Sequence, residues 1–435
     1  MKDLNKELIG FINASPSVFH AAAAIGKTLE AAGFARLKES EVWKLSAGKY
    51  YAVRNNSSVI AFDIPAELKD YHFQFAASHC DSPTYKVKAE AELAGPGEYL
   101  RLDVEAYGGM IDYTWLDKPL SVAGRVLVKE DGAVVSRLLS IDKDILLIPS
   151  VAIHMNRNVN SGFAFNRAVD LCPLFSAGEL KKGDFDKMIA GELGVDPEAI
   201  VAKDLFLVNR QTPEIWGYAE EFVSAPKLDD LQAAFSSLEG FLTGENPGCI
   251  NVYACFDNEE VGSNTKQGAM STFLKDTVGR INGCLGRSSE ELRTALAKSF
   301  MVSFDNAHAV HPNHPEFSDG VNKCFMNQGV VIKENAAQHY TTDAFSRAVF
   351  KEICAKAQVP TQVFANRSDM AGGGTLGNIS NVQVSLHAVD IGLPQLAMHS
   401  AWETAGTEDL LSMEQAFRAF YETEVRVVGD GEFEL

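Results

Sequence analysis

INVYACFDNEEVGS, residues 250–263, joins a mostly apolar run to two adjacent glutamates and a glycine. An apolar run of this length that ends at a turn is typical of a buried strand. Neighbouring side chains in a strand point to opposite faces, so Glu259 and Glu260 cannot both face the same way. We therefore expect one of them to bind a metal ion while the other handles a proton. Alone, such a pair is usually solvated surface, so this interpretation needs the rest of a ligand set.

Predicted helices and strands alternate on both sides of this segment. Between Tyr85 and Val223 the pattern changes. In that stretch strands are short, turns are rich in glycine, and one helix, 185–193, is predicted. The flanking regions have the alternation of an α/β fold. We therefore predict a discontinuous α/β domain, residues 1–85 plus 224–435, interrupted by an inserted β-rich domain, residues 86–223. The predicted helices are 4–34 with a break at Ser15-Pro16-Ser17, 229–242, 342–357 and one from Met413, and the predicted strands include 73–77, 250–256, 300–304 and 384–389.

Composition and charge limit the class of protein. The chain has 435 residues, of which 46% are hydrophobic and 22% charged, as in a soluble globular protein of two domains. The net charge of −19 argues against nucleic acid and anionic membranes as partners. The seven cysteines are scattered without CxxC spacing, so we expect neither disulfides nor a cysteine-rich zinc site. Because no apolar run approaches the roughly 18 residues of a membrane span and the N-terminus lacks a signal pattern, we expect a cytoplasmic protein.

Further acidic and histidine side chains stand near predicted strand and helix ends. His79 follows the strand 73–77, Asp305 ends the strand 300–304, Asp229 opens a helix, and His399 follows an apolar triplet. Each has an ordinary explanation, such as a surface histidine or, for Asp229, a helix N-cap. Ligand sites in α/β sheets gather at the carboxyl ends of strands, however, so we expect these side chains to meet.

With one glutamate of the pair, these side chains make two histidines and three carboxylates. Such a set suits two divalent ions that share a bridging carboxylate. Two ions about 3.5–4 Å apart can hold and polarise a hydrolytic water. Asp81, two residues after His79, is placed to orient its imidazole. No thiolate is among the candidates, so zinc, cobalt and manganese all remain open.

Several short motifs are spread from end to end along the chain. They are Ser15–His20 (SPSVFH), His79–Pro83 (HCDSP), Val104–Gly109 (VEAYGG), Thr114–Asp117 (TWLD), Ile153-His154, Leu228–Leu231 (LDDL), Asp257–Ser263 (DNEEVGS), Ala307–Asn313 (AHAVHPN) and Met398–Ser400 (MHS). In this order they resemble the motifs of the aspartyl aminopeptidases, a family of dinuclear-zinc exopeptidases.

The resemblance implies a role for each ligand candidate. His79 and His399 would be terminal ligands on separate metals, and Asp229 would bridge them. The remaining carboxylate ligands would be Glu260 and Asp305, with Glu259 as general base and Asp81 orienting His79. The cofactor would be two divalent ions per chain, zinc first, with Co²⁺ or Mn²⁺ as alternatives. The fold would be a catalytic α/β domain of the dinuclear zinc exopeptidase type, with an insert that drives dimerisation and assembly into a homo-oligomer, commonly a dodecamer built from dimers.

Substrate recognition is less closely matched. Lys333 and Tyr340 stand at family positions tied to substrate recognition, and we add His154 and His308 to the substrate-binding set. His154 would reach the site of a neighbouring subunit, because its segment matches one that lies at the family's subunit boundary. The chain departs from the family pattern at four places: Cys80 replaces threonine, Trp402 replaces arginine, Glu316-Phe317-Ser318 lacks basic residues, and the loop Asp369–Thr375 differs. None of these positions is a metal ligand, but the last two lie near the expected substrate.

The expected function is therefore hydrolysis of the first residue from peptides with a free N-terminus. A water bridging the two metals would attack, with Glu259 as general base, and a preference for acidic first residues (Asp or Glu) stays open. Two alternatives remain: a dinuclear-metal deacylase for N-acyl amino acids, and a self-assembling scaffold or cargo protein with a vestigial site. A requirement for a free amine separates the first alternative, and normal behaviour without metal would favour the second.

Overall fold

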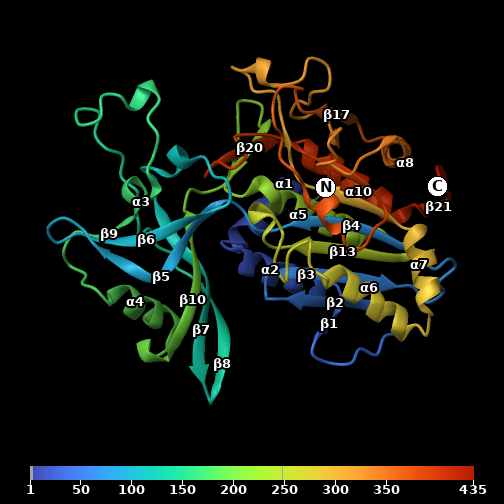
Figure 1. The fold of residues 1–435 in the computed structure, drawn as a ribbon, viewed down its shortest axis with the longest axis horizontal. Helices are drawn as coiled ribbons and strands as arrows, with labels where there is room; N and C mark the ends of the chain where they lie inside the picture. The colour runs from blue at the N-terminus through green and yellow to red at the C-terminus, as the bar shows by residue number, and fades with distance from the viewer. Residues whose placement is uncertain (1–2, 247) are drawn as a thin grey trace.

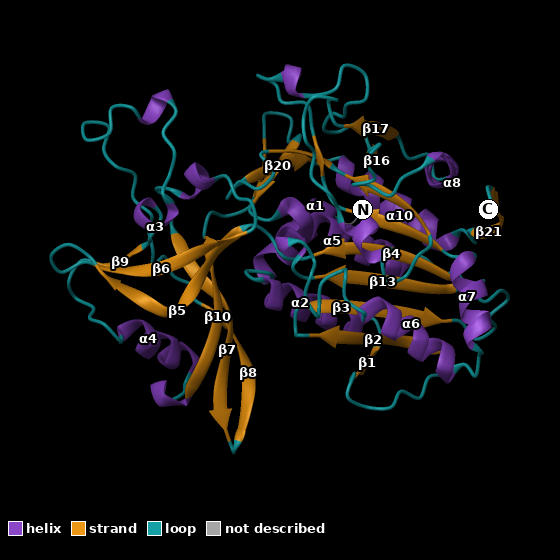
Figure 2. Ribbon diagram, viewed as in Figure 1, coloured by secondary structure: helices purple, strands orange, loops and turns teal. Residues whose placement is uncertain are grey.

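A mixed sheet with helices on both faces forms the larger part of the molecule (Figure 1, Figure 2). In the residues that this computed structural model describes, 3–246 and 248–435, the sheet has nine strands in the order β1-β2-β3-β13-β4-β14-β18-β16-β17. Its strands are β1 (Ala35–Leu37), β2 (Gly48–Arg54), β3 (Ser58–Ile64), β4 (Phe73–His79), β13 (Ile250–Phe256), β14 (Phe300–Phe304), β16 (Val330–Glu334), β17 (Thr361–Ala365) and β18 (His387–Gly392). The four central strands β13, β4, β14 and β18 run parallel, so their carboxyl ends meet at one edge of the sheet.

The central strands are mostly apolar and almost entirely buried, as expected where both faces of a sheet are covered. In β13 the side chains of Tyr253 and Cys255 enter one core, and those of Val252 and Ala254 enter the core on the opposite face. The helices on the first face are α1 (Leu4–Ala14), α2 (Val18–Ala31), α5 (Leu228–Thr243), α8 (Ala344–Lys356) and α10 (Asp409–Glu422). The helices on the second face are α6 (Phe273–Cys284), α7 (Ser289–Ala297) and α9 (Leu376–Ser380).

A second, antiparallel sheet with its own apolar core lies beside the first (Figure 1). Within the described residues its six strands run in the order β8-β7-β10-β5-β6-β9. They are β5 (Thr84–Ala94), β6 (Leu100–Tyr107), β7 (Leu120–Glu130), β8 (Ala133–Ser140), β9 (Leu174–Ser176) and β10 (Ile200–Asn209), with helices α3 (Arg167–Asp170) and α4 (Asp184–Leu193). The predicted fold class, an α/β domain interrupted by a β-rich insert, is confirmed.

A third sheet joins the two parts. It contains β11 (Glu214–Trp216), β12 (Phe222–Ala225), β20 (Glu403–Gly406), β19 (Pro394–Leu396) and β15 (Ala307–His308). Strand β11 therefore falls in the predicted insert but belongs to a sheet built largely from the C-terminal half. The domain limits at 85/86 and 223/224 stay a prediction, and the first predicted segment includes residues 1 and 2, which lie outside the described residues.

Most predicted elements form, with shifted ends. The strand predicted at 384–389 begins at His387, and the last long helix begins at Asp409 rather than Met413. A C-terminal hairpin of β21 (Arg426–Gly429) and β22 (Glu432–Glu434) follows that helix. Among the described helices, none combines the length and apolar character needed to cross a membrane.

Candidate metal centre

The predicted ligand residues gather at the carboxyl edge of the central strands. His79 is the last residue of β4, Asp305 follows β14, and Asp229 lies in the first turn of α5. Glu259 and Glu260 follow β13, and His399 lies in the turn between β19 and β20. The glutamate pair forms a short 3₁₀ helix, η4 (Glu259–Val261), instead of continuing the strand. The turn, and not strand alternation, therefore separates the directions of the two carboxylates.

Asp229 lies between the two histidines. Its Oδ1 is 3.6 Å from Nε2 of His79, and its Oδ2 is 3.4 Å from Nε2 of His399. The same His399 nitrogen lies 3.4 Å from Oε2 of Glu260. An aspartate that turns one oxygen toward each histidine has the geometry that a carboxylate shared by two metal ions would need.

Three overlapping groups of possible ligand atoms result, each with all its atoms within 4.8 Å of one another. The groups are His79, Asp229, Asp230 and Asp305; His79, Glu259 and Glu260; and Asp229, Glu260 and His399. Glu260 belongs to two groups and Glu259 to one. The structure thus brings together all five predicted ligands and the predicted base, and it adds Asp230.

Both histidines present Nε2 to the carboxylates because Nδ1 is occupied. Nδ1 of His399 lies 3.0 Å from the carbonyl oxygen of Gly109, and Nδ1 of His79 lies 3.2 Å from the carbonyl oxygen of Asp81. Since a carbonyl can only accept, each Nδ1 carries a proton, and Nε2 is the ring nitrogen that faces the carboxylates. Histidines that bind a metal are usually oriented in this way.

Asp81 contacts both His79 and the turn that carries Glu259 and Glu260. Its Oδ1 lies 3.3 Å from Nδ1 of His79. Its two oxygens also accept the backbone N–H groups of Glu259 and Glu260, each at 3.1 Å. The Tyr107 hydroxyl donates to Oδ2 at 2.7 Å. One buried carboxylate therefore fixes both the histidine and the turn that carries the glutamates.

The backbone is strained on either side of the ligands. Lys227, Asn258, Ala397 and His399 have φ values of +61°, +64°, +56° and +67°. Residues other than glycine rarely adopt this conformation, which costs about 1–3 kcal/mol each, and they keep it only where the surroundings impose it. Here it bends the chain so that side chains from separate segments meet.

Two groups in this cluster, Glu259 and His399, have raised pKa values. Burial, with Asp305 and Asp81 nearby, raises the pKa of Glu259 to about 8. Burial alone would lower the pKa of His399, but Asp229 and Glu260 outweigh it and raise that pKa to about 10. Protons are thus retained where carboxylates crowd together, which is the electrostatic condition for binding cations.

The donor set fits divalent metal ions. Among the described residues, Asp229 Oδ1, Asp230 Oδ1 and Glu260 Oε1 are buried without a hydrogen-bond partner. Buried oxygens of this kind are costly unless something binds them. Carboxylate oxygens and imidazole nitrogens are the ligands that zinc takes in catalytic sites.

The predicted substrate residues have different surroundings. Lys333 Nζ donates to the carbonyls of Asp305 at 2.7 Å and Asn306 at 3.3 Å, and it lies 4.9 Å from the centre of the Tyr340 ring. Lys333 is 2% and Tyr340 4% exposed. Two of the three N–H groups of the ammonium are therefore committed to the strand end that carries Asp305.

His308 lies beside a cavity of about 280 Å³, whose wall also includes Phe317, Arg367, Met370 and Met398. Residues from two of the four places that depart from the family pattern, 316–318 and 369–375, line this cavity. His154 lies on an exposed loop between β8 and β9, which extends away from the second sheet (Figure 1). In the described part of the chain, His154, His308, His311 and His314 are outside all three ligand groups.

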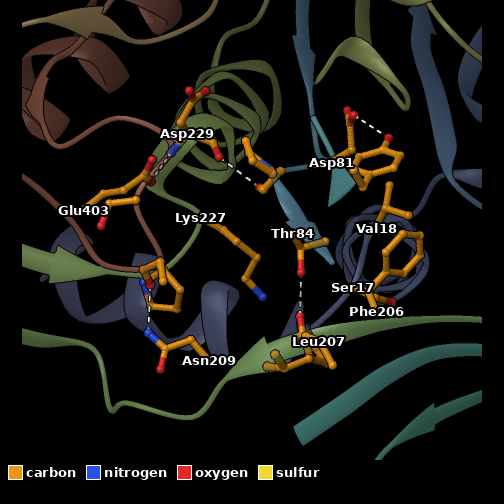
Figure 3. A pocket seen from close by; sticks show the side chains of 18 of the residues that line it. Ser17, Val18, Asp81, Thr84, Phe206, Leu207, Asn209, Lys227, Asp229 and Glu403 are labelled. Carbon is orange, nitrogen blue, oxygen red and sulfur yellow. Dashed lines mark hydrogen bonds between the residues drawn. The ribbon is translucent and has the colours of Figure 1, made fainter. Parts of the chain in front are cut away.

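A smaller cavity, about 50 Å³, lies where the second sheet meets the metal centre (Figure 3). Lys227 lines it and donates to the carbonyl of Ser15 at 2.6 Å. Burial lowers the pKa of Lys227 to about 7. Asn209, the last residue of β10, donates to the carbonyl of Ala401 at 2.7 Å, which ties the insert to the loop of His399.

Two functional candidates were not predicted from the sequence. Asp230 stands next to Asp229, and its Oδ2 accepts the N–H of His79 at 3.1 Å. Glu403 accepts the N–H groups of Asp229 and His399. Their nearness in sequence to Asp229 and His399 was the only available signal, and it does not show which backbone groups they bind.

Comparisons with known proteins agree with this geometry. The family model "Aminopeptidase I zinc metalloprotease (M18)" matches residues 11–421. A probable M18 family aminopeptidase 2 from Clostridium novyi (strain NT) is 44% identical over 422 residues, which cover 95% of this chain and 98% of that protein. A similar relative from Stutzerimonas stutzeri (strain A1501) is 37% identical and covers 96% of this chain and 98% of its own length.

Solved structures are similar over the whole chain. A chain in the cryo-EM structure of the Ape4 and Nbr1 complex has a TM-score of 0.92 at 36% identity, covering 97% of this chain and 86% of that one. The S. cerevesiae mApe1 dodecamer has a TM-score of 0.85 at 26% identity, covering 97% and 96%. The resemblance seen in the motifs is confirmed: the chain belongs to the M18 family of zinc aminopeptidases, the aspartyl aminopeptidase family.

Proposed function

We propose that this metalloaminopeptidase releases the first residue of peptides at a centre that holds two zinc ions per chain. His79, Asp229 and Asp305 would hold one ion, and Asp229, Glu260 and His399 the other. The observation that carries this proposal is the position of Asp229, with one oxygen toward each histidine at 3.6 and 3.4 Å. Cobalt or manganese would suit the same oxygen and nitrogen donors.

Bound zinc supplies Lewis acidity, which polarises a carbonyl and lowers the pKa of water. The chain's own groups do the rest. Glu259, outside the two proposed ligand sets, takes the proton from the attacking water and later delivers it to the leaving amine. Asp81 holds the backbone of Glu259 and so fixes where its carboxylate stands. The free α-amine of the substrate would be bound by neighbouring acidic groups, which restricts cleavage to the N-terminus.

A preference for acidic first residues is the finer part of this proposal. Lys333 is the cation beside Asp305, and one of its N–H groups is not used by the two carbonyls. The net charge of −19 repels acidic substrates at long range, so a local cation is required to attract them. Tyr340 packs against Lys333, and His308 lines the cavity of about 280 Å³.

A peptide library scored by first residue tests the substrate class. The proposal expects release of Asp and Glu ahead of neutral residues from peptides with a free amine, and no release from N-acetylated copies. Faster cleavage of the acetylated copies would instead identify a deacylase. Equal cleavage of acidic and neutral peptides would remove the acidic preference while leaving the aminopeptidase.

We also propose a homo-oligomer, a dodecamer built from dimers, in which His154 serves a neighbouring subunit. Its loop is exposed and carries apolar side chains, such as Met155 at 85% and Val151 at 51% exposure. Such a surface is typical of a protein interface. The solved mApe1 relative is a dodecamer.

Mixing two inactive variants tests the shared site. Glu259→Gln and His154→Ala chains should regain activity together, because some interfaces would pair an intact Glu259 with an intact His154 of its neighbour. If labelled subunits exchange and no activity returns, His154 acts within its own subunit or outside catalysis.

A further inference from the structure

Glu403 is a buried carboxylate with no role in the proton transfer or in the proposed ligand sets. It is 1% exposed and is the first residue of β20. Its Oε1 accepts the backbone N–H of His399 at 2.7 Å, and its Oε2 accepts that of Asp229 at 3.0 Å. Figure 3 shows Glu403 beside Asp229 at the edge of the small cavity.

The two backbone groups come from distant parts of the chain and have no regular partner. His399 has a φ of +67°, and Asp229, although in the first turn of α5, has the non-helical angles φ −84° and ψ 107°. The N–H of Asp229 is in the first turn of α5, where a helix offers no backbone acceptor, and the N–H of His399 lies in the turn between β19 and β20, outside their pairing. A single side chain that accepts both is therefore what holds the two segments at a fixed separation.

Glu403 is itself held firmly. In the third sheet its strand pairs with β12 on one side and β19 on the other, with Glu403 opposite Ala225. The fixed strand aims the carboxylate at the two N–H groups. On the far side of those groups, Nε2 of His399 and Oδ2 of Asp229 lie 3.4 Å apart.

We infer that Glu403 is a positioning residue that sets the spacing of Asp229 and His399 for the metal ion they share. The inference rests on the proposed two-ion centre. Only a carboxylate suits this place, because each of its oxygens accepts one N–H. Glutamine offers one acceptor oxygen, and its NH₂ group would face the second N–H, donor against donor.

Asp409 provides a matched control. It is fully buried, and its Oδ2 and Oδ1 accept the backbone N–H groups of Asn327 at 2.6 Å and Gly329 at 2.9 Å. Asp409→Asn therefore makes the same chemical change as Glu403→Gln, in a carboxylate that bonds no ligand residue. A general loss of packing should affect both variants alike.

The experiment measures zinc affinity by competition with a chromophoric chelator, zinc content, and thermal unfolding of the metal-free protein. Glu403→Gln should weaken binding of at least one of the two ions by about 10–100-fold, the usual effect of losing a group that orients a ligand. The Co²⁺-loaded variant should also show an altered absorption spectrum. Asp409→Asn should lower the unfolding temperature without either effect. Equal zinc affinity in Glu403→Gln and the native protein, or equal weakening in both variants, would overturn the inference.

If Glu403→Gln fails to fold, hydrogen exchange in the native metal-free protein gives a second test. The amides of Asp229 and His399 should exchange slowly, since both are bonded to Glu403. Fast exchange of both in the folded protein would overturn the inference. A native protein that binds fewer than two zinc ions would instead contradict the proposed function, so the two failures are distinguishable.

Discussion

Replacing Asp81 with asparagine should weaken the metal centre although Asp81 belongs to neither proposed ligand set. The native carboxylate accepts the N–H groups of Glu259 and Glu260 through different oxygens, and it lies beside Nδ1 of His79. Asparagine has one acceptor oxygen, so its NH₂ group must face one of these N–H donors. The change removes the charge and at least one of the bonds that hold the glutamate turn.

The size of the effect can be estimated from those contacts. A hydrogen bond to a charged group contributes about 1.5–3 kcal/mol, and about 1.4 kcal/mol is a factor of ten in an equilibrium constant. Loss of one such bond therefore predicts zinc binding weaker by about 10- to 100-fold in Asp81→Asn. Tyr107→Phe removes only the hydroxyl that donates to Asp81 at 2.7 Å, and it leaves the carboxylate in place. Its effect should be smaller, about 2- to 10-fold.

Zinc affinity of the native protein and of both variants would be measured by chelator competition, and kcat would be compared at saturating zinc. Asp81→Asn should lose kcat even when loaded, because the turn that carries Glu259 is no longer fixed. Unchanged affinity and kcat in Asp81→Asn would refute the reasoning. So would a larger effect for Tyr107→Phe than for Asp81→Asn.

Three further predictions concern single side chains. Glu259→Gln should keep its zinc and lose about 10²–10⁴-fold in kcat, whereas Glu260→Gln should lose zinc; exchanged phenotypes would reverse the two roles. Lys333→Met should slow cleavage of all substrates, because two backbone carbonyls lose their donor. Cleavage of acidic substrates should slow more than cleavage of neutral ones. Equal losses in kcat/KM for both classes would mean that Lys333 only supports the strand end. Burial lowers the pKa of His20 from 6.5 to about 4. Below pH 6.5 the unfolded chain therefore binds a proton that the folded protein does not bind. The free energy of unfolding consequently falls as the pH drops toward 4. His20→Gln should reduce that fall by up to about 3 kcal/mol in denaturant unfolding of the metal-free protein, and an unchanged pH dependence would contradict the assignment.

The parts of the fold that the sequence predicts are those governed by local pattern. Apolar runs at 250–256 and 300–304 predict buried strands, and the break at Ser15-Pro16-Ser17 separates α1 from α2. Because the central strands are parallel, acidic and histidine residues at their ends meet at one edge. This rule accounts for His79, Glu260 and Asp305, whereas Asp229 in α5 and His399 between β19 and β20 are brought to the same edge by other segments.

What the sequence could not predict depends on contacts between distant segments. Asn258 has a positive φ, although asparagine can adopt other backbone conformations. Its side chain donates to the hydroxyl of Tyr107, a residue of the insert, at 2.8 Å. The partners of Lys333 are backbone carbonyls, which carry no sequence signal. The pairing of β12 with β20, which decides where the third sheet lies, joins residues about 180 positions apart, as the hydrogen bond between Ser224 and Thr404 shows.

The inserted sheet cannot be regarded as an assembly module separate from the chemistry. The carbonyl of Gly109 accepts a hydrogen bond from Nδ1 of His399, and the N–H of Ile111 donates to the His399 carbonyl at 2.9 Å. Tyr107 donates to Asp81 on the opposite side of the centre. One segment of the insert thus contacts the support of both histidines, since Asp81 holds His79. A shift of the second sheet against the α/β domain would therefore move the groups that hold both candidate ligand histidines.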